Sequence, residues 1–136
     1  MKRILIMGLP GSGKTTLATV LAKTLDASHF NADAVRAQFN DWDFSPEGRI
    51  RQGRRMRELC DSSSSIYAIA DFVCPLPEMR DIFNADYTIW MDTISSGRFE
   101  DTNQIFVPPT TYDFCIKNFE DQTVADRLAN NIKNSL

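Results

Sequence analysis

Residues 8–15, Gly8-Leu9-Pro10-Gly11-Ser12-Gly13-Lys14-Thr15, decide the fold of this chain. They match the pattern G-x-x-x-x-G-K-[ST], in which glycines let backbone N–H groups point inward at phosphate oxygens. The stretch follows the continuous apolar run 3–7, which is typical of a strand buried on both faces. It precedes residues 17–25, whose leucines and valine have helical spacing. Strand, loop and helix in this order are the context that a phosphate-binding loop requires.

Each part of the loop predicts a contact with a nucleoside triphosphate. We expect Lys14 to act as a catalytic residue that neutralises the β- and γ-phosphates, and the Thr15 hydroxyl to bind Mg²⁺. ATP and Mg²⁺ are therefore the expected cofactors. A guanine-reading Asn-Lys-x-Asp motif does not occur in the sequence, which argues against a GTPase. The expected ATP-binding residues of this region are Gly8, Pro10, Gly11, Ser12, Gly13, Lys14, Thr15 and Thr16.

The rest of the chain alternates between predicted strands and helices. Further strands are expected at 28–30, 66–73, 87–91 and 112–116. One helix is expected after Asn31 or Asp33 as its N-cap, and another runs from Pro46 to about Cys60 after the N-cap Ser45. Two further helices are expected over 75–84 and over 122–136. The alternation predicts one α/β domain over residues 1–136, a nucleotide-kinase-like P-loop NTPase sandwich of three layers with a five-stranded parallel sheet.

Composition limits the partners. The 136 residues carry a net charge of −3, so no overall basic field favours nucleic acid or an anionic membrane. No apolar run approaches the length of a membrane span, and the N-terminus lacks the pattern of a signal peptide. Three cysteines without metal-ligand spacing indicate reduced thiols, and we expect a cytoplasmic protein. The single histidine, His29, is open to two interpretations, a base or a structural residue.

Charged residues beyond the second predicted strand indicate where a phosphoryl acceptor binds. The carboxyl end of that strand should open beside the phosphate loop. Asp33 there is a candidate general base, and Arg36 a candidate ligand for an anionic acceptor. An N-cap aspartate and a solvated arginine are the alternative interpretation of the same two residues.

The helix expected after Ser45 has one apolar face that includes an arginine. At about 100° per residue, Arg49 shares this face with Gly53, Met56 and Cys60. An arginine on an apolar face is costly unless it meets an anion, which makes Arg49 a ligand candidate. The other arginines of this helix are expected on its solvated faces: Arg51, Arg54, Arg55 and Arg57.

Three segments, together with the phosphate loop, resemble the adenylylsulfate kinases. That family reads Asp-Gly-Asp-Asn-x-Arg after its second strand, then Leu-Gly-Phe-Ser-x-x-Asp-Arg-x-x-Asn, then Phe-Ile-Ser-Pro-x-x-x-x-Arg. The corresponding segments here are Asn31-Ala32-Asp33-Ala34-Val35-Arg36, residues 42–52 beginning Trp42-Asp43-Phe44-Ser45, and Phe72-Val73-Cys74-Pro75 with Arg80. They occur in the family's order within residues 1–85.

The resemblance implies the strand order 2-3-1-4-5, Asp33 as general base, and 3′-phosphorylation of adenylylsulfate (APS) to PAPS, a step of sulfate assimilation. Arg36 and Arg49 would hold the acceptor's phosphosulfate, and Phe44 would stack on its adenine. Phe44 is equally open to interpretation as a hydrophobic staple. The implied partner is a small-molecule nucleotide acceptor, and a homodimer is left open. The full set of implied substrate-binding residues is Arg36, Phe44, Arg49, Gln52, Phe72, Cys74 and Pro75.

The chain also departs from this family. Asn31, Gln52 and Cys74 stand where the family has Asp, Asn and Ser. The family's Lys-Gly-Leu-Tyr lid is missing, and the shorter segment 95–109 replaces it. A kinase needs some cover that excludes water from the reacting phosphate. Arg98 in this segment is a candidate ligand of the transferring phosphate, or otherwise a surface arginine.

A second family shares part of the pattern. Polynucleotide 5′-hydroxyl kinases have an Asn-x-Asp-x-x-Arg frame and end their third strand with Ile-x-Asp, as Ile69-Ala70-Asp71 does here. The adenylylsulfate kinases have a small residue at the last of these places. Asp71 is therefore a candidate metal-shell residue or partner of Thr15, or else an aspartate that caps the next turn. A polynucleotide or nucleoside 5′-hydroxyl kinase is the alternative function, and a non-catalytic ATP-binding switch is a further one.

Overall fold

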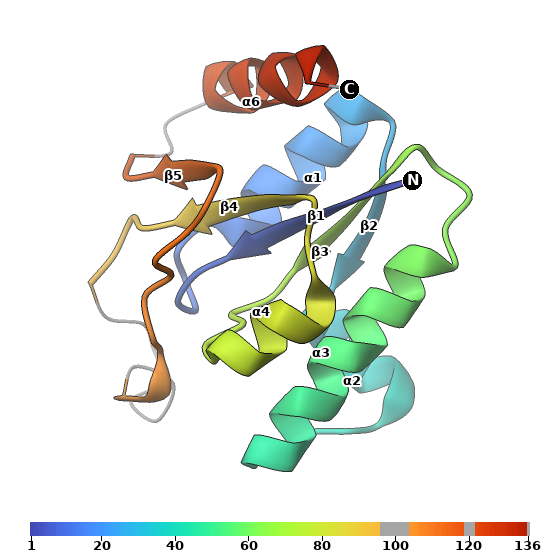
Figure 1. Ribbon diagram of the computed structural model, residues 1–136, viewed down its shortest axis with the longest axis vertical. Coiled ribbons are helices and arrows are strands. Elements are labelled where there is room, and N and C mark those ends of the chain that lie inside the picture. Colours follow the sequence, from blue (N-terminus) through green and yellow to red (C-terminus); the bar gives the residue numbers. More distant parts are fainter. Residues whose placement is uncertain (96–103, 119–121, 136) are drawn as a thin grey trace.

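A five-stranded sheet forms the centre of the computed structural model (Figure 1), which describes residues 1–95, 104–118 and 122–135. Its order is β2-β3-β1-β4-β5, and every neighbouring pair is parallel. Both the predicted strand number and the predicted order are confirmed. The strands are β1 (Lys2–Met7), β2 (Ser28–Asn31), β3 (Tyr67–Asp71), β4 (Tyr87–Met91) and β5 (Phe114–Ile116).

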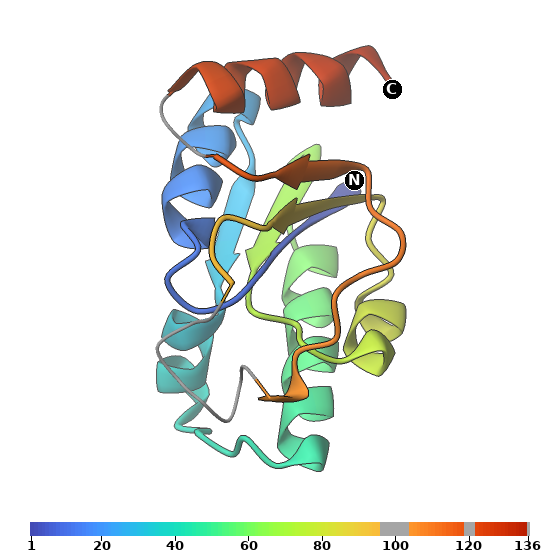
Figure 2. The same ribbon diagram turned by 90° about the vertical axis from the view of Figure 1, so that its left-hand side faces the viewer.

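Helices cover both faces of this sheet. The two core clusters place α1 and α6 against one face of the strands and α2, α3 and α4 against the other. Figure 2 shows α1 and α4 on opposite sides of the strands. Neighbouring residues of β1 enter opposite layers, because successive side chains of a strand alternate between its faces. Ile4 packs in the core under α1 and α6, whereas Leu5 packs in the core under α3 and α4. The helices are α1 (Lys14–Leu25), α2 (Ala32–Phe39), α3 (Pro46–Asp61), α4 (Pro77–Phe83) and α6 (Gln122–Asn134).

Two helix starts show how the sequence sets these elements. Ser45 caps α3 as expected, with Oγ accepting a hydrogen bond of 3.2 Å from the Gly48 amide. Asn31, and not Asp33, caps α2: its Oδ1 accepts from the Ala34 amide at 3.0 Å. The Asp33 carboxylate is therefore not used as a helix cap.

Some elements are shorter than the sequence predicts. The third strand ends at Asp71 and not at residue 73, and at Cys74 the chain leaves the extended region altogether, with a φ of 50°. Ile66 lies outside the strand with 66% of its surface exposed. The helix expected over 75–84 spans Pro77–Phe83, with Pro77 in its first turn. None of the helices in the described ranges combines the length and apolar character needed to cross a bilayer.

Three polar segments meet at one edge of the sheet. The glycine loop follows β1, Asn31 ends β2, and Asp71 ends β3. In the strand register Asp71 lies beside Ile6 on one side and Asn31 on the other. Because the carboxyl ends of parallel strands open on the same crevice, these segments build one site.

Candidate active site

The glycine loop has a backbone conformation that needs glycine at more than one position. A Cβ at Gly8 would lie 2.7 Å from the Met91 carbonyl oxygen, so only glycine fits there. Gly13, with φ of 97°, begins α1 in the left-handed region. The Ser12 Oγ is buried and has no hydrogen-bond partner among the described residues. An unpartnered buried hydroxyl before the N-terminus of a helix is what an anion-binding loop leaves for its ligand.

Lys14 lies over this loop. Its side chain is largely buried, with 8% of the residue exposed, and Nζ donates a hydrogen bond of 3.0 Å to the Leu9 carbonyl oxygen. The loop is also fastened to the end of β4, because Thr93 Oγ1 donates to the Ser12 carbonyl oxygen at 2.7 Å. The ammonium group of Lys14 is thus held at the phosphate loop before a nucleotide arrives.

Thr15 belongs to a polar network built on Asp71. Thr15 Oγ1 donates to Asp71 Oδ1 at 3.0 Å, and the Asn31 amide donates to Thr15 Oγ1 at 3.1 Å and to Asp71 Oδ1 at 3.2 Å. His29 Nε2 lies 2.5 Å from Asp71 Oδ2. Asp71 itself is only 2% exposed. Of the two interpretations of Asp71, this geometry favours the partner of Thr15 over a turn cap.

The network fits Mg²⁺ held together with a nucleotide. A hydroxyl and a carboxylate are the hard oxygen donors that Mg²⁺ takes, usually with waters and substrate phosphates completing its shell. In the described parts of the chain no group of three or more His, Cys, Asp or Glu side chains could hold a metal by itself. Thr15 and Asp71 would therefore hold the ion only in company with phosphates on the loop.

A cavity of about 860 Å³ opens beside the phosphate loop. Gly8 and Ser12 lie behind its surface in the loop, and Arg98 falls outside the described residues. Every other predicted site residue lines the cavity. From the loop and α1 these are Pro10, Gly11, Gly13, Lys14, Thr15 and Thr16; from the other side they are Asp33, Arg36, Phe44, Arg49, Gln52, Asp71, Phe72, Cys74 and Pro75.

Two arginines hold the ring of Phe44. The guanidinium carbon of Arg36 lies 4.3 Å from the ring centroid and that of Arg49 lies 5.4 Å from it. Arg36 also donates to the carbonyl oxygens of Asp41 and Asp43, and Arg49 Nε donates to the Phe44 carbonyl oxygen at 2.8 Å. Both arginines are buried, whereas 51% of Phe44 is exposed. An accessible aromatic face thus lies beside two buried cations.

Asp33 stands on the wall of the cavity in the first turn of α2, and its side chain is exposed. No hydrogen bond or ion pair engages its carboxylate within the described ranges. Since Asn31 provides the cap of α2, the Asp33 carboxylate remains accessible to a group bound in the cavity.

Two of the predicted substrate-binding residues, Gln52 and Cys74, line the cavity with side chains that are buried and not open to a ligand. Gln52 is 2% exposed; its Nε2 donates to the Ala32 carbonyl oxygen and its Oε1 accepts from Arg55. Burial raises the pKa of the Cys74 thiol to about 12, so this cysteine is a neutral, compact wall residue at neutral pH. None of the three cysteines, all described, is in a disulfide.

The segment that follows residue 103 is tied to the same wall. The Val107 amide donates to the Pro75 carbonyl oxygen at 2.9 Å. Arg80 donates to the carbonyl oxygens of Cys74, Pro75 and Val107, and lies over the Phe106 ring. Arg80 therefore joins the loop after β3 to the segment around Val107.

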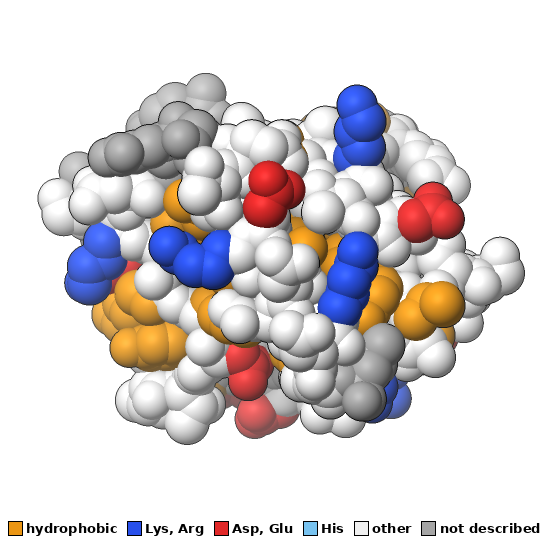
Figure 3. Space-filling view, turned by 90° about the horizontal axis from the view of Figure 1, so that it is seen from above, with side chains coloured by type: hydrophobic (Ala, Val, Ile, Leu, Met, Phe, Trp, Pro, Cys, Tyr) orange, Lys and Arg blue, Asp and Glu red, His pale blue; other side chains and the backbone are white. Residues whose placement is uncertain are grey.

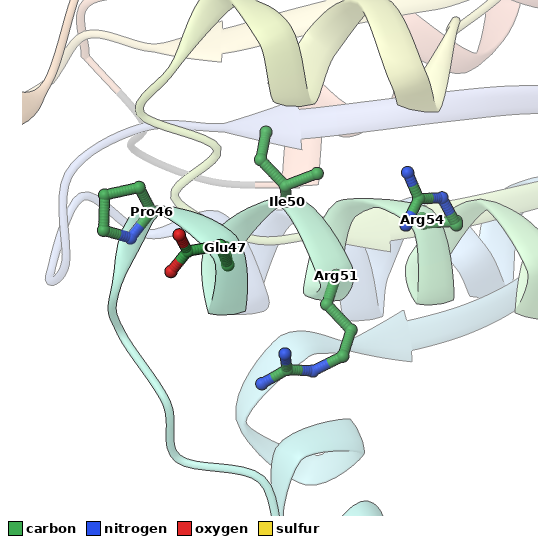
Figure 4. A pocket seen from close by; sticks show the side chains of 5 residues that line it. All are labelled: Pro46, Glu47, Ile50, Arg51 and Arg54. Atoms are coloured by element: carbon green, nitrogen blue, oxygen red, sulfur yellow. The ribbon is translucent and has the colours of Figure 1, made fainter.

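The arginines on the other faces of α3 differ from one another. Arg51 and Arg54 are exposed as expected, and they line a shallow depression with Pro46, Glu47 and Ile50 (Figure 4). Figure 4 shows Arg51 leaving the helix on a different side from Arg54. The expectation of a solvated side chain is wrong for Arg55, whose side chain is 14% exposed because Arg55 bonds Asp41 at 3.0 Å and covers the Phe39 ring.

Asp41 organises the loop that carries Phe44. Hydrogen bonds from Arg51 and then Arg55 hold the pKa of Asp41 well below its usual range. A lowered pKa in the folded state stabilises the protein above the unfolded pKa, about 4, and that contribution is lost as the pH falls toward the folded value.

We expect Asp41→Asn to lower the melting temperature at pH 7, because two arginines lose their charged acceptor. The difference from the wild type should narrow progressively as the pH falls below about 4, since the wild-type carboxylate then also becomes protonated. Thermal unfolding from pH 2.5 to 7 measures this, with the exposed Asp81→Asn of α4 as the matched control. A difference in melting temperature that is constant over this range would contradict the role of the charge.

The sequence did not place three residues at the site, although Asn31 was an N-cap candidate and His29 was open to interpretation as a base or a structural residue. Trp42 lines the cavity and is 50% exposed, and Asn31 and His29 belong to the Asp71 network. One signal was present for the last two: residues 29 and 31 are two apart on a strand, so their side chains project to the same side.

The fold and the phosphate loop define a P-loop nucleotide-binding protein. The family model described as an AAA domain matches residues 4–93, and the chain belongs to that family. A search of curated proteins gave no significant match.

Solved structures of small-molecule kinases share this fold. The chain is similar to the APS kinase of Mycobacterium tuberculosis in complex with AMPPNP and APS, at a TM-score of 0.80 and 17% identity, with 97% of each chain covered. It is also similar to shikimate kinase from Aquifex aeolicus, at a TM-score of 0.69 and 14% identity, with 98% of this chain and 97% of that chain covered. A gluconokinase from Sinorhizobium meliloti is similar at a TM-score of 0.68 and 13% identity, with 98% of this chain and 97% of that chain covered. The fold is therefore that of P-loop kinases.

Proposed function

We propose that the chain is an ATP-dependent kinase that phosphorylates a hydroxyl of a small nucleotide, with adenylylsulfate as the preferred acceptor. One observation carries the proposal. The phosphate loop and the Phe44 ring held by Arg36 and Arg49 line the same cavity of about 860 Å³. A phosphate donor at the loop and an anionic aromatic acceptor at Phe44 would then share a cavity that Asp33 also lines.

The phosphate-loop residues would bind and orient the donor. Lys14 would place its charge beside the β- and γ-phosphates. The Ser12 hydroxyl, which has no hydrogen-bond partner among the described residues, would donate to a phosphate oxygen. Thr15 and Asp71 would hold Mg²⁺, which when bound neutralises charge on the transferring phosphoryl group. Phosphoryl transfer needs little covalent chemistry from the protein, so positioning and electrostatics would supply most of the rate.

The opposite wall would bind the acceptor. Arg36 and Arg49 are buried, and a buried cation gains most from an anionic ligand such as a phosphosulfate. The exposed face of Phe44 would stack on the base. Asp33, accessible at the cavity wall, would accept the proton of the attacking hydroxyl.

A polynucleotide 5′-hydroxyl kinase remains the alternative, and the surface charges favour it less. Two of the α3 arginines, Arg51 and Arg55, are paired with Asp41. Figure 3 adds only that the face seen from the α6 end, a helix with no residue in the cavity lining, carries described Lys and Arg side chains interspersed with Asp and Glu. A polymeric acceptor normally uses a basic patch along its phosphate backbone.

The direct test is a panel of acceptors with γ-labelled ATP: adenylylsulfate, nucleosides, nucleotides, shikimate, gluconate and a 5′-hydroxyl oligonucleotide. We expect transfer to adenylylsulfate at the highest kcat/KM. Transfer to the oligonucleotide alone would replace the proposal by the polynucleotide alternative. ATP binding without transfer to any acceptor would instead favour the non-catalytic switch.

Arg49→Ala should lower kcat/KM for the acceptor at least about tenfold while ATP affinity is unchanged. A hydrogen bond to a charged group is worth about 1.5–3 kcal/mol, and Arg49 faces the cavity. Arg54→Ala, on the same helix but outside the cavity, is the matched control and should change little. Equal losses of kcat/KM at both positions, together with an acceptor affinity that falls steeply as the salt concentration rises, would indicate a polynucleotide acceptor.

The proposal includes a cytoplasmic location, where ATP is abundant and thiols stay reduced. A homodimer stays a prediction, and size-exclusion chromatography with light scattering would test it.

A further inference from the structure

His29 is the one histidine of the chain, and the proposed function gives it no role. It lies in β2 with 20% of its side chain exposed. Its Nε2 is 2.5 Å from Asp71 Oδ2, while Asp71 is almost entirely buried. A buried carboxylate is costly unless donors satisfy its oxygens, so the partners of each oxygen decide how the group is held.

The two oxygens of Asp71 have different surroundings. Oδ1 accepts from Thr15 at 3.0 Å and from Asn31 at 3.2 Å, and faces the phosphate loop. Oδ2 has His29 at 2.5 Å and, more distantly, the Asn31 amide at 3.4 Å. His29 is therefore the short contact on the oxygen that does not meet Thr15. Without it, Oδ2 would keep only the longer contact to the Asn31 amide, so the orientation of the carboxylate, and with it the place of Oδ1 beside Thr15, would be held less firmly.

The strand register explains why a histidine can do this. Asn31 lies directly beside Asp71, and His29 lies beside Ile69, two pairs earlier on the same two strands. His29 must reach diagonally to Asp71, over a distance of about 7–8 Å between backbone positions, which suits a long ring side chain. Because a carboxylate only accepts, Nε2 is assigned as the donating nitrogen.

We propose that His29 is a positioning residue of the metal shell: its Nε2–H fixes Asp71 so that Oδ1 is presented to Thr15 and to Mg²⁺ held with the nucleotide. The inference rests on the proposed function only for the presence of a magnesium nucleotide at the loop. Outer partners that orient a metal-holding carboxylate commonly change metal affinity about 10–100-fold when they are removed.

The test is calorimetric ATP binding by the purified full-length chain, once with Mg²⁺ and once with EDTA. The ratio of the two dissociation constants measures how much the metal adds to ATP affinity, independently of any acceptor. His29→Leu removes the donor, and His29→Gln keeps an N–H near the place of Nε2. Thr15→Ala defines the ratio that remains when the hydroxyl ligand is lost. Ser28→Ala is the matched control, because Ser28 lies on the same strand as His29 and its hydroxyl contacts only Ser63 and Ser65 among the described side chains.

We expect His29→Leu to reduce the ratio about tenfold toward the Thr15→Ala value, with ATP affinity in EDTA unchanged. His29→Gln should restore most of the ratio, and Ser28→Ala should match the wild type. If His29→Leu does not fold, His29→Asn, whose amide is too short to reach Oδ2, makes the same comparison with His29→Gln. A wild-type ratio in the Leu or Asn variant, even with a lower melting temperature, would overturn the inference.

The outcome is separable from that of the proposed function. A wild type that phosphorylates none of the acceptors but binds ATP more tightly with Mg²⁺ would contradict the kinase proposal and still test His29. A wild type whose ATP affinity does not depend on Mg²⁺ would overturn the inference about His29, whatever the acceptor panel gives.

Discussion

Asp33→Asn is expected to lower kcat by about 10²–10⁴-fold and to leave the dissociation constant of ATP unchanged. This is the range that a positioned general base contributes to proton transfer. The amide keeps the shape of the side chain but cannot take the proton of the attacking hydroxyl. Asp33 lines the cavity and does not contact the glycine loop through any hydrogen bond in the described ranges, so ATP binding should not depend on its charge.

The Asp33 variant can be interpreted cleanly because the structure removes one alternative. Asn31 caps α2, so the substitution does not delete a helix cap. Kinetics under single-turnover conditions, ATP titration and thermal unfolding give the three quantities needed, with Asp81→Asn as the matched carboxylate-to-amide control. A variant that unfolds at assay temperature, or that retains more than about a tenth of wild-type kcat, would contradict the role of general base.

Lys14→Ala should lower kcat at least about a hundredfold, which corresponds to about 3 kcal/mol of transition-state stabilisation. The ammonium group would act on charge that builds up on the transferring phosphoryl group, and no other group of the loop provides a mobile point charge. We expect the fold to persist, because a buried charge without its anionic ligand adds little net stability.

Steady-state turnover with the preferred acceptor and circular dichroism test the Lys14 variant together. Lys23→Ala, a change of the same kind at an exposed position of α1, is the control. Turnover near that of the wild type in a folded Lys14→Ala protein would remove the assignment of ATP to the glycine loop.

Local chemistry made most of the fold predictable. The phosphate loop fixed a strand before it and a helix after it, and Ser45 followed by Pro46 marked the start of α3. Helical periodicity correctly assigned Arg49 to the face of Met56 and Cys60, all of which are buried. The strand order came from the resemblance to the adenylylsulfate kinases, because periodicity alone does not say which strands are neighbours.

The parts that the sequence did not reveal depend on contacts between distant segments. Periodicity describes how a helix divides its own surface, and not which loop folds over it. Arg55 was expected in solvent for this reason, whereas Asp41 and Phe39 cover it. Similarly, only the pairing of β2 with β3 brings His29 to Asp71, across 42 positions of the chain. Neither contact leaves a local pattern.

The pairing of Asn31 with Asp71 bears on how such proteins diverge. The adenylylsulfate kinase pattern has Asp at the first of these positions and a small residue at the second, whereas this chain has Asn31 and Asp71. A comparison of sequences position by position would treat the differences at residues 31 and 71 as two unrelated substitutions. In the sheet the two positions are side by side, so either arrangement places one carboxylate at the edge beside Thr15. Selection at this edge would then preserve a charge at a point in space, and homologues are better compared by the pair than by either column.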